Sequence, residues 1–182
     1  MEWMILPLKR YAQFSGRSPR KEYWMFLLFT IIVRIVLLIL DNVLGLGGHS
    51  SSYRMAGANG YAAGGTAYGG VLSGLWSLGI LIPSIAVAVR RLHDLNRSGW
   101  WLLAPAVPYL IGFAMIFPAI MSGAAGGANP FNMASFGLAG IFMLVGFVLA
   151  IVVFVFTVLP GTKGPNKYGA DPYGGELEEV FA

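Results

Sequence analysis

Four long apolar runs, separated by polar or glycine-rich connections, dominate the 182-residue chain. A helix needs about 20 apolar residues to cross roughly 30 Å of hydrocarbon, and each run is close to that length. None shows the alternation of a half-buried strand, and lipid does not tolerate open sheet edges. The pattern therefore predicts an all-α, polytopic integral membrane protein with four transmembrane helices, at about 23–44, 71–89, 100–121 and 136–159.

The connections between the runs predict how the chain is organised. We expect a single four-helix transmembrane domain over residues 1–175, followed by an acidic tail at 176–182. The external connections at 46–70 and 122–135 are rich in glycine and alanine, a composition typical of flexible linkers with little core of their own. Residues 2–14 mix apolar and basic side chains, which indicates a short segment lying at the membrane interface.

Basic residues gather on one side of the expected spans. Of the twelve Lys and Arg residues, ten lie before the first run, between the second and third runs, or after the fourth. Arg54 lies alone on the other side, and Arg34 lies inside the first run. By the positive-inside rule both termini are cytoplasmic, which predicts a multi-pass membrane protein with its basic connections inside.

Composition agrees with a membrane protein and excludes several kinds of site. The chain is 57% hydrophobic and 11% charged, against about 45–50% and about 25% in globular domains. It has no cysteine, which excludes disulfides, zinc–thiolate sites and iron–sulfur clusters. With only two histidines a multi-histidine site is not expected, so we predict no metal, no cofactor and no nucleic-acid partner.

Three polar blocks interrupt the apolar pattern on the basic side. The first, FSGRSPRKEYW at 14–24, offers Ser18 as the N-cap and Pro19 as the first residue of the first helix. The second, PSIAVAVRRLHDLNRSGWW at 83–101, ends in turn formers and in two tryptophans suited to the headgroup belt. The third, PGTKGPNKYGADP at 160–172, is nearly all turn formers and predicts a sharp end to the fourth helix.

Other residues inside these runs predict local geometry. Ser98 or Asn96 is expected to cap the third helix. Four prolines are expected to bend the second and third helices: Pro83, Pro105, Pro108 and Pro118. Six glycines are expected to permit close helix contact: Gly74, Gly79, Gly112, Gly137, Gly140 and Gly146.

Together the three blocks resemble a bacterial inner-membrane family catalogued as domain of unknown function 805. Its members carry F-x-G-R-x-x-R-K-E-Y/F-W, then P-S-x-A-x-x-x-R-R-L-H-D-x-x-R/K-S-G-W-W, and then P-G-x-x-G-x-N-x-Y/F-G-x-D-P. This chain departs from the pattern in a longer first external connection and in one extra apolar run between the paired tryptophans and the tail. The resemblance implies a location and a shape but no reaction, because the family's activity is not established.

The three blocks bring ten polar residues to the cytoplasmic helix ends: Arg17, Arg20, Lys21, Arg90, Arg91, His93, Asp94, Arg97, Asn166 and Lys167. One hypothesis is a binding site for an anionic group such as a lipid phosphate, because the guanidinium fork matches phosphate oxygens. The alternative is that these charges set topology and pair between helices, chiefly Glu22 and Asp94 with arginines. On one helix face Asp94 is placed to pair with either Arg90 or Arg91.

Two further charged features have both a structural and a functional interpretation. His93 precedes Asp94, but neighbours on a helix point about 100° apart and no nucleophile spacing accompanies them, so no catalytic residue is predicted. Arg34 lies well inside the first run, where a charge costs about 2.5–3.5 kcal/mol on insertion scales. It is expected either to pair structurally, with Asp41 two turns along the same face or elsewhere in the bundle, or to line an ion path.

The sequence therefore predicts a non-enzymatic inner-membrane module of uncharacterised biochemical role. Its basic cytoplasmic face is expected to bind an anionic lipid or ligand, or to dock a partner protein. Membrane lipids, chiefly anionic ones, are the expected partners, with a homo-oligomer or a membrane-protein partner as open alternatives. The alternative function is a small transporter or channel subunit that uses Arg34, and the third is a membrane enzyme acting on a phosphate-bearing substrate.

Overall fold

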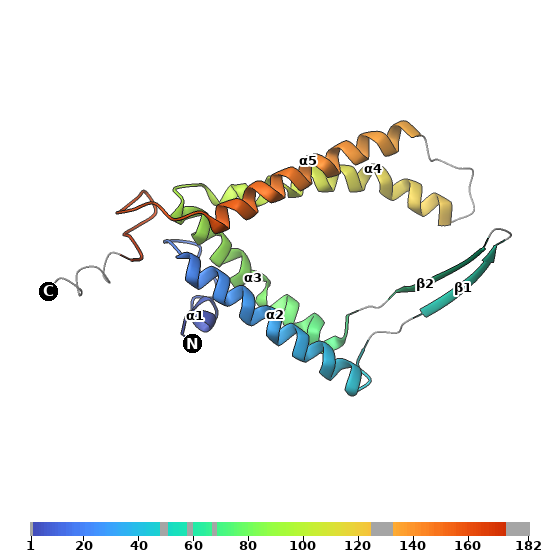
Figure 1. Cartoon of the computed structure of the whole chain (residues 1–182), viewed down its shortest axis with the longest axis horizontal. Coiled ribbons are helices and arrows are strands. Elements are labelled where there is room, and N and C mark those ends of the chain that lie inside the picture. The colour runs from blue at the N-terminus through green and yellow to red at the C-terminus, as the bar shows by residue number, and fades with distance from the viewer. Residues whose placement is uncertain (1, 48–50, 58–59, 67–68, 125–132, 174–182) are drawn as a thin grey trace. The chain divides into compact units, whose positions relative to one another are not determined.

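The computed structural model describes residues 2–47, 51–57, 60–66, 69–124 and 133–173. It divides into two compact units, which are Met1–Gln13 with Trp24–Ala86, and Phe14–Tyr23 with Val87–Ala182. Four helices are long and apolar enough to cross a membrane (Figure 1). The predicted all-α, four-span architecture is confirmed in this respect, whereas a single domain over 1–175 stays a prediction. The acidic tail at 176–182 lies outside the described residues.

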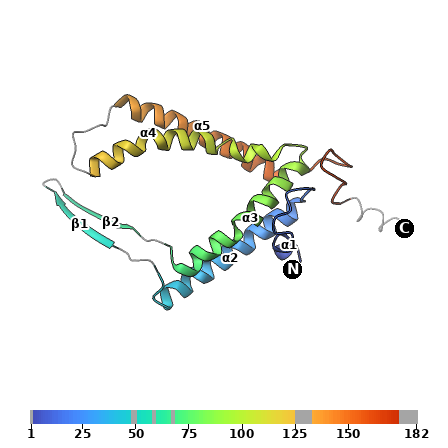
Figure 2. The same cartoon turned by 180° about the vertical axis from the view of Figure 1, so that it is seen from behind.

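The first two spans form α2 (Arg20–Val43) and α3 (Val71–Asp94). The two helices run in opposite directions (Figures 1 and 2). Each extends a few residues past the apolar run that predicted it, because helix geometry continues into the flanking charged residues. Arg90, Arg91 and Asp94 therefore lie on the last turns of α3, as the expected pairing on one helix face requires.

Asp41 joins the last turn of α2 to the first turn of α3. Its carboxylate oxygens accept hydrogen bonds from the backbone N–H groups of Leu72 and Ser73, both at 2.9 Å. These are donors that the start of a helix leaves without an intrahelical partner, and a negative charge there also favours the helix dipole. Gly70 makes the contact possible, because a Cβ on it would lie 2.0 Å from the Asp41 carboxylate carbon.

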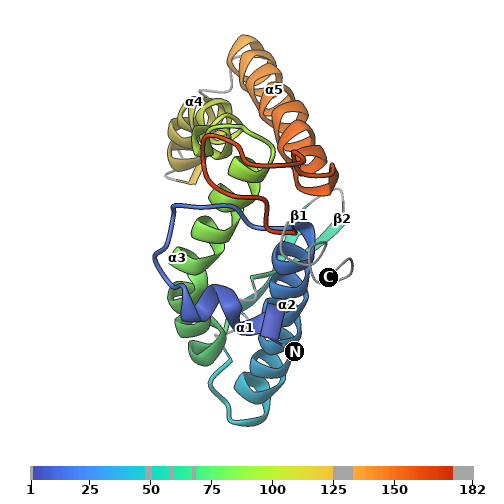
Figure 3. The same cartoon turned by 90° about the vertical axis from the view of Figure 1, so that its left-hand side faces the viewer.

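The N-terminal helix α1 (Glu2–Lys9) belongs to the first unit, and the segment after it is attached to the middle of α3. Pro83 lies inside α3 and has no N–H to give to the carbonyl four residues earlier, which is that of Gly79. The Tyr11 hydroxyl donates to this carbonyl at 2.6 Å. Figure 3 shows α1 beside α2 and α3. The segment after α1, predicted to lie at the membrane interface, thus contacts α3. The Tyr11 hydroxyl supplies the donor that the Gly79 carbonyl lacks, and a carbonyl inside a membrane needs such a donor.

In the second unit α4 (Ala106–Ala124) packs along α5 (Met133–Val158), as Figure 1 shows. Two of the predicted glycines permit this approach. A Cβ on Gly112 would lie 3.1 Å from the Ala139 carbonyl, and one on Gly146 would lie 3.2 Å from the Tyr109 ring. The prediction is wrong for the other four, because a Cβ would meet nothing within 4 Å among the described residues: Gly74, Gly79, Gly137 and Gly140.

The third span is not the continuous helix predicted for 100–121. It begins as a 3-10 helix, η1 (Gly99–Leu103), and α4 starts only after a turn that contains Pro105. Pro105 has no N–H for the Trp101 carbonyl four residues earlier, which accepts instead from the Ala104 N–H at 3.2 Å. Proline also suits the start of a helix, so the 3-10 helix ends here and α4 begins. The Ser98 hydroxyl accepts from the Trp100 N–H at 3.4 Å, so the predicted serine cap is present, but on η1.

The connection at 46–70 contains strands that the linker prediction missed. β1 (Ser51–Gly57) pairs in antiparallel register with β2 (Gly60–Thr66), with the first residue of one opposite the last of the other. Strand formation depends more on the pairing partner than on residue composition, so a glycine-rich segment does not exclude it. At 122–135 the helices take up both ends of the connection, and the residues between them are outside the described part.

Candidate functional site

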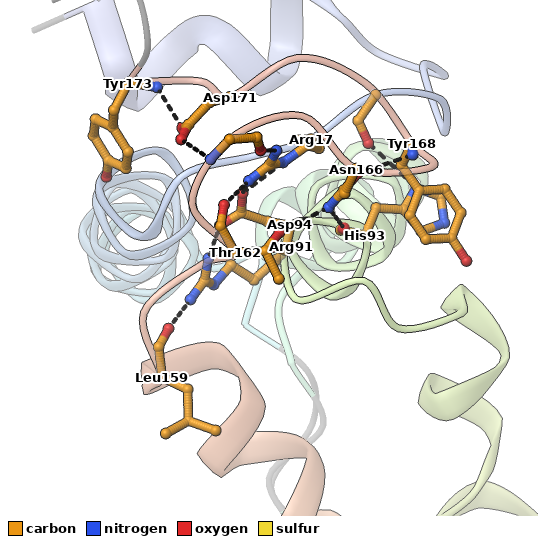
Figure 4. A network of polar contacts seen from close by, with 12 residues as sticks. Arg17, Arg91, His93, Asp94, Leu159, Thr162, Asn166, Tyr168, Asp171 and Tyr173 are labelled. Atoms are coloured by element: carbon orange, nitrogen blue, oxygen red, sulfur yellow. Dashed lines mark hydrogen bonds and ion pairs between the residues drawn. The ribbon is translucent and has the colours of Figure 1, made fainter. Parts of the chain in front are cut away.

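Within the second unit, segments from both ends of the chain meet the last turn of α3 (Figure 4). One segment precedes α2 and the other follows α5. Between them lie three arginines and two carboxylates with at most 7% of their surface exposed. We call these five residues the buried charge network: Arg17, Glu22, Arg90, Arg91 and Asp94.

The C-terminal segment supplies the donors that the end of α3 lacks. The last carbonyls of a helix have no intrahelical partner. The Asn166 side chain donates to the carbonyl of His93 at 2.9 Å. Thr162 donates to the carbonyl of Asp94 twice, from its backbone N–H at 2.9 Å and from its hydroxyl at 3.0 Å. The helix ends at Asp94, and Asn96, two residues further on, has a φ of 57°, the left-handed conformation common after helix ends.

Asp94 is the centre of the buried charge network. Its Oδ1 accepts from Arg17 Nε at 2.9 Å, and its Oδ2 accepts from Arg91 Nη1 at 2.5 Å. Of the two arginines weighed from spacing, Arg91 is therefore the partner. Gly161 packs directly on the carboxylate, because a Cβ there would lie 2.0 Å from Oδ2. The glycine is required by close approach, since a larger residue would displace the ion pair.

The two arginines on Asp94 also bind backbone carbonyls. Arg17 donates from both terminal nitrogens and Arg91 from Nε and Nη2. The acceptors lie at the end of α5 and just beyond it: Thr157, Leu159, Thr162 and Gly164. A planar guanidinium with five donors suits this bridging role. The arginines thus fasten the end of α5 and the following segment to the end of α3.

A second buried ion pair joins the first turn of α2 to α3. Arg90 Nη2 lies 3.0 Å from Glu22 Oε1, and each side chain is 1% exposed. Beside it the backbone N–H of Ser18 donates to the carbonyl of Arg90 at 3.0 Å. The network holds three positive and two negative groups, so carbonyl dipoles must balance the remaining charge.

His93 is held by contacts other than Asp94. Its Nδ1 lies 3.2 Å from the carbonyl oxygen of Gly16, and because a carbonyl only accepts, Nδ1 carries the proton in this contact. The imidazole stacks on Tyr168, with centroids 3.8 Å apart and planes 4° from parallel. Asp94 is occupied by arginines, so the structure offers no carboxylate-oriented imidazole at this place.

A turn held by Asp171 shapes the segment after α5. Its Oδ1 accepts from the Tyr173 N–H at 3.0 Å and its Oδ2 from the Gly164 N–H at 2.8 Å. These two hydrogen bonds, the one from Tyr173 being the stronger cause, favour the carboxylate and hold the pKa of Asp171 below its ordinary value. The turn presents Gly164 to Arg17.

Five cations around the network have exposed side chains: Arg20, Lys21, Arg97, Lys163 and Lys167. Arg97 lies over two aromatic rings, 5.8 Å from the Trp101 centroid and 5.2 Å from that of Phe156. Lys167 lies 4.9 Å from the Tyr168 ring. Such cation–π contacts position a charge and leave its remaining donors accessible. We call these five residues the exposed cations.

The ten residues proposed from the sequence therefore separate into groups. Arg17, Arg90, Arg91 and Asp94 are buried and bind one another or the chain itself, as the salt-bridge alternative predicted. His93 and Asn166 are half-buried and hold the C-terminal segment. The other four are exposed: Arg20, Lys21, Arg97 and Lys167. Binding of an external anion by any of the ten stays a prediction.

Arg34 and Asp41 do not form the pair suggested by their spacing. Asp41 is 1% exposed and caps α3, whereas Arg34 is exposed on α2. None of the ion pairs among the described residues includes Arg34. Arg34 and Asp41 belong to the first unit, whereas the residues of the buried charge network belong to the second.

Sequence reasoning missed the role of the C-terminal segment as a cap for α3. Thr162, Gly164 and Tyr168 were treated only as helix-stopping turn residues, although they contact Arg17 and His93. The sequence signal for this role was the motif at 160–172, in which small and hydrogen-bonding residues stand in a fixed order. Contacts made through backbone carbonyls leave no further trace in the residue types.

Four membrane-length helices, with charged side chains buried at the end of one of them, define a multi-pass integral membrane protein. The chain belongs to the family described as "Protein of unknown function (DUF805)", whose model matches residues 11–170. The resemblance seen in the three polar blocks is thereby confirmed.

The chain is similar to two proteins of Escherichia coli (strain K12), "Inner membrane protein YhaH" and "Inner membrane protein YhaI". It is 31% identical to the first and 32% to the second over 172 residues, covering 94% of this chain and 97% and 96% of theirs. It is also 34% identical to "Uncharacterized protein YiiR" of the same organism, over 50% of this chain and 54% of that one. No solved structure matches. With its four spans, the chain is a protein of the bacterial inner membrane.

Proposed function

We infer that the chain is a non-catalytic inner-membrane module whose exposed cations bind anionic phospholipid headgroups at the cytoplasmic surface. One observation carries this proposal: the buried charge network uses its own arginines internally, while five further cations stay exposed around it. The first group holds helix ends together. The second keeps exposed side chains, and one of them, Arg20, also donates to the Val158 carbonyl at 3.3 Å. The proposal assigns different roles to residues that look equivalent in the sequence.

Electrostatics supports the choice of ligand. The cytoplasmic leaflet is negatively charged, and each Lys or Arg close to it contributes about 1 kcal/mol of attraction. The positive-inside rule favours the orientation in which the exposed cations face that leaflet. Arg97 lies over Trp101, and tryptophan is one of the residues enriched at headgroup depth.

The transport and enzyme alternatives lack a supporting observation. Arg34 is exposed on α2 and Asp41 is buried as a helix cap, which supports a structural role for Asp41 and gives no support to a polar path within the first unit. His93 stacks on Tyr168, and Asp94 binds arginines. These contacts support a structural role for both residues.

The test compares lipid selectivity with stability. Purified protein is placed in mixed phosphatidylglycerol and phosphatidylcholine nanodiscs, and retained lipids are counted by native mass spectrometry. A triple variant replaces Arg97, Lys163 and Lys167 with glutamine. With about 1 kcal/mol per cation, its preference for phosphatidylglycerol should fall by at least about tenfold.

A single-charge comparison supplies the matched control. Arg97→Gln and Arg54→Gln each remove one arginine charge, and Arg54 lies on the opposite side of the expected topology. Arg97→Gln should weaken the preference, and Arg54→Gln should leave it unchanged. Equal selectivity in the triple variant and the wild type, with both folded, would refute headgroup binding by the exposed cations.

A further inference from the structure

Arg34 is a charge inside a membrane-length helix that no described residue of the chain neutralises. Its side chain is exposed on α2. Asp41, seven residues further along the helix, is 1% exposed and uses both carboxylate oxygens on the backbone of α3. Among the residues described by the structure, Arg34 takes part in none of the ion pairs or side-chain hydrogen bonds.

Among the described residues, no acidic group forms an ion pair with Arg34, and this includes Glu2 on α1 in the same unit. The sequence has no Asp or Glu between Asp41 and Asp94, and none between Asp94 and Asp171. α4 and α5 therefore hold no carboxylate. A second copy of the chain would bring the same deficit. An anion that binds Arg34 at membrane depth would therefore come from a different molecule.

The depth of Arg34 indicates which leaflet can supply that anion. Nine residues separate it from Val43 at the end of α2, which is about 13 Å at 1.5 Å per residue. Fourteen residues separate it from Arg20 at the other end, which is about 21 Å. Long basic side chains bury their stems in hydrocarbon and place the charged head toward the nearer polar surface. The Val43 end is the nearer one.

The surroundings of Arg34 are aliphatic. Ile31 is 47% exposed and Ile35 is 52% exposed, and both flank Arg34 on α2. A phospholipid supplies an anionic phosphate for the guanidinium together with acyl chains for these neighbours. The guanidinium fork also matches two phosphate oxygens, which a single-point cation would not.

We propose that Arg34 binds the phosphate of a phospholipid from the leaflet at the Val43 end of α2, with the lipid's acyl chains against Ile31 and Ile35. This is a site separate from the exposed cations, and it does not rest on the function proposed for them. It gives the intramembrane arginine a role as a lipid anchor of α2. A carboxylate on the transmembrane helix of another protein is the competing partner.

The test measures contact between arginine carbon and lipid phosphorus directly. Protein labelled with ¹³C at arginine Cζ is reconstituted in phosphatidylglycerol and phosphatidylethanolamine bilayers in phosphate-free buffer. Solid-state NMR then records ¹³C–³¹P dipolar dephasing. The difference between wild type and Arg34→Leu isolates Arg34 from the other arginines, and Arg34→Gln repeats the comparison with a polar side chain. Folding is checked by the melting temperature of each variant.

The expected result is a Cζ component that lipid phosphorus dephases in the wild type and that both variants lack. Because the buffer contains no free phosphate, this component reports lipid alone. An Arg34 difference signal that phosphorus does not dephase would overturn the proposal. Retention of another membrane protein by the wild type but not by Arg34→Leu, with no dephasing, would instead identify the carboxylate partner and would equally overturn it.

Discussion

Replacing Asp94 with asparagine should destabilise the protein strongly, because Asp94 neutralises two buried arginines. Arg17 and Arg91 contact its two carboxylate oxygens, and Asp94 is 1% exposed. In the wild type the buried charge network has three positive and two negative groups. Asp94→Asn keeps the shape of the side chain but raises the excess from one positive charge to two, in a place that water does not reach.

The magnitude follows from the cost of breaking a buried ion pair. Removing one partner of such a pair costs about 3–5 kcal/mol, because the remaining charge stays buried without compensation. For a chain of this length, 1 kcal/mol changes the melting temperature by about 2–4 °C. The expected loss is therefore about 6–20 °C. Arg17→Met added to Asp94→Asn should recover part of it, because the extra charge is then removed.

The assay is thermal unfolding in mild detergent, followed by tryptophan fluorescence at one fixed scan rate because membrane proteins often unfold irreversibly. Asp171→Asn is the matched control, since it makes the same chemical change in the same unit at a carboxylate that accepts only two backbone hydrogen bonds. Asparagine keeps one acceptor oxygen, so that control loses one hydrogen bond to a charged group, at about 1.5–3 kcal/mol. If Asp94→Asn lowers the melting temperature no more than Asp171→Asn does, Asp94 is not the centre of the network.

Three further changes test other contacts. Tyr11→Phe should cost about 0.5–1.5 kcal/mol, because it removes the donor to the Gly79 carbonyl. In a Pro83→Ala background the cost should be much smaller, because residue 83 regains an N–H. Equal losses of melting temperature in both backgrounds would contradict this role of Tyr11. Gly161→Ala should destabilise strongly because its Cβ would lie 2.0 Å from Asp94 Oδ2, whereas Gly140→Ala, with open space, should be neutral or mildly stabilising in the same assay. The lowered pKa of Asp171 means that its turn is stabilised above the ordinary Asp pKa of about 3.9 and loses that stabilisation as pH falls through the lower folded pKa. In an NMR titration the chemical shift of the Gly164 amide should change only below about pH 3.9. Asp171→Asn should abolish this change.

The helices could be predicted from the sequence, because a long apolar run in hydrocarbon must form its backbone hydrogen bonds within itself, which a helix does. Length and hydropathy located all four spans, although the break at Pro105 shows that a single residue can divide one of them. The hairpin at Ser51–Gly57 and Gly60–Thr66 was not predicted, because strand pairing depends on a partner segment and leaves only a weak pattern in a glycine-rich sequence.

The candidate site was predictable in membership but not in roles. Spacing indicated that Asp94 would meet Arg90 or Arg91, and Arg91 is the partner. Spacing gave no indication that Arg17, 77 residues away, would complete the contact. The same reasoning suggested Arg34 with Asp41, yet Asp41 faces the start of α3. Local periodicity identifies which residues share a helix face, whereas tertiary packing decides which of them form an ion pair or a hydrogen bond.

The central claim is that the segment before α2, the end of α3 and the segment after α5 all lie on the cytoplasmic side of the membrane. The chain has no cysteine, so single cysteines can be introduced at Lys21, Arg97 and Lys167 without background. Labelling with a membrane-impermeant thiol reagent, in intact spheroplasts and in inverted vesicles, then reports the side of each. The account predicts that all three react only in inverted vesicles. Reaction of any one of them in intact spheroplasts would contradict it.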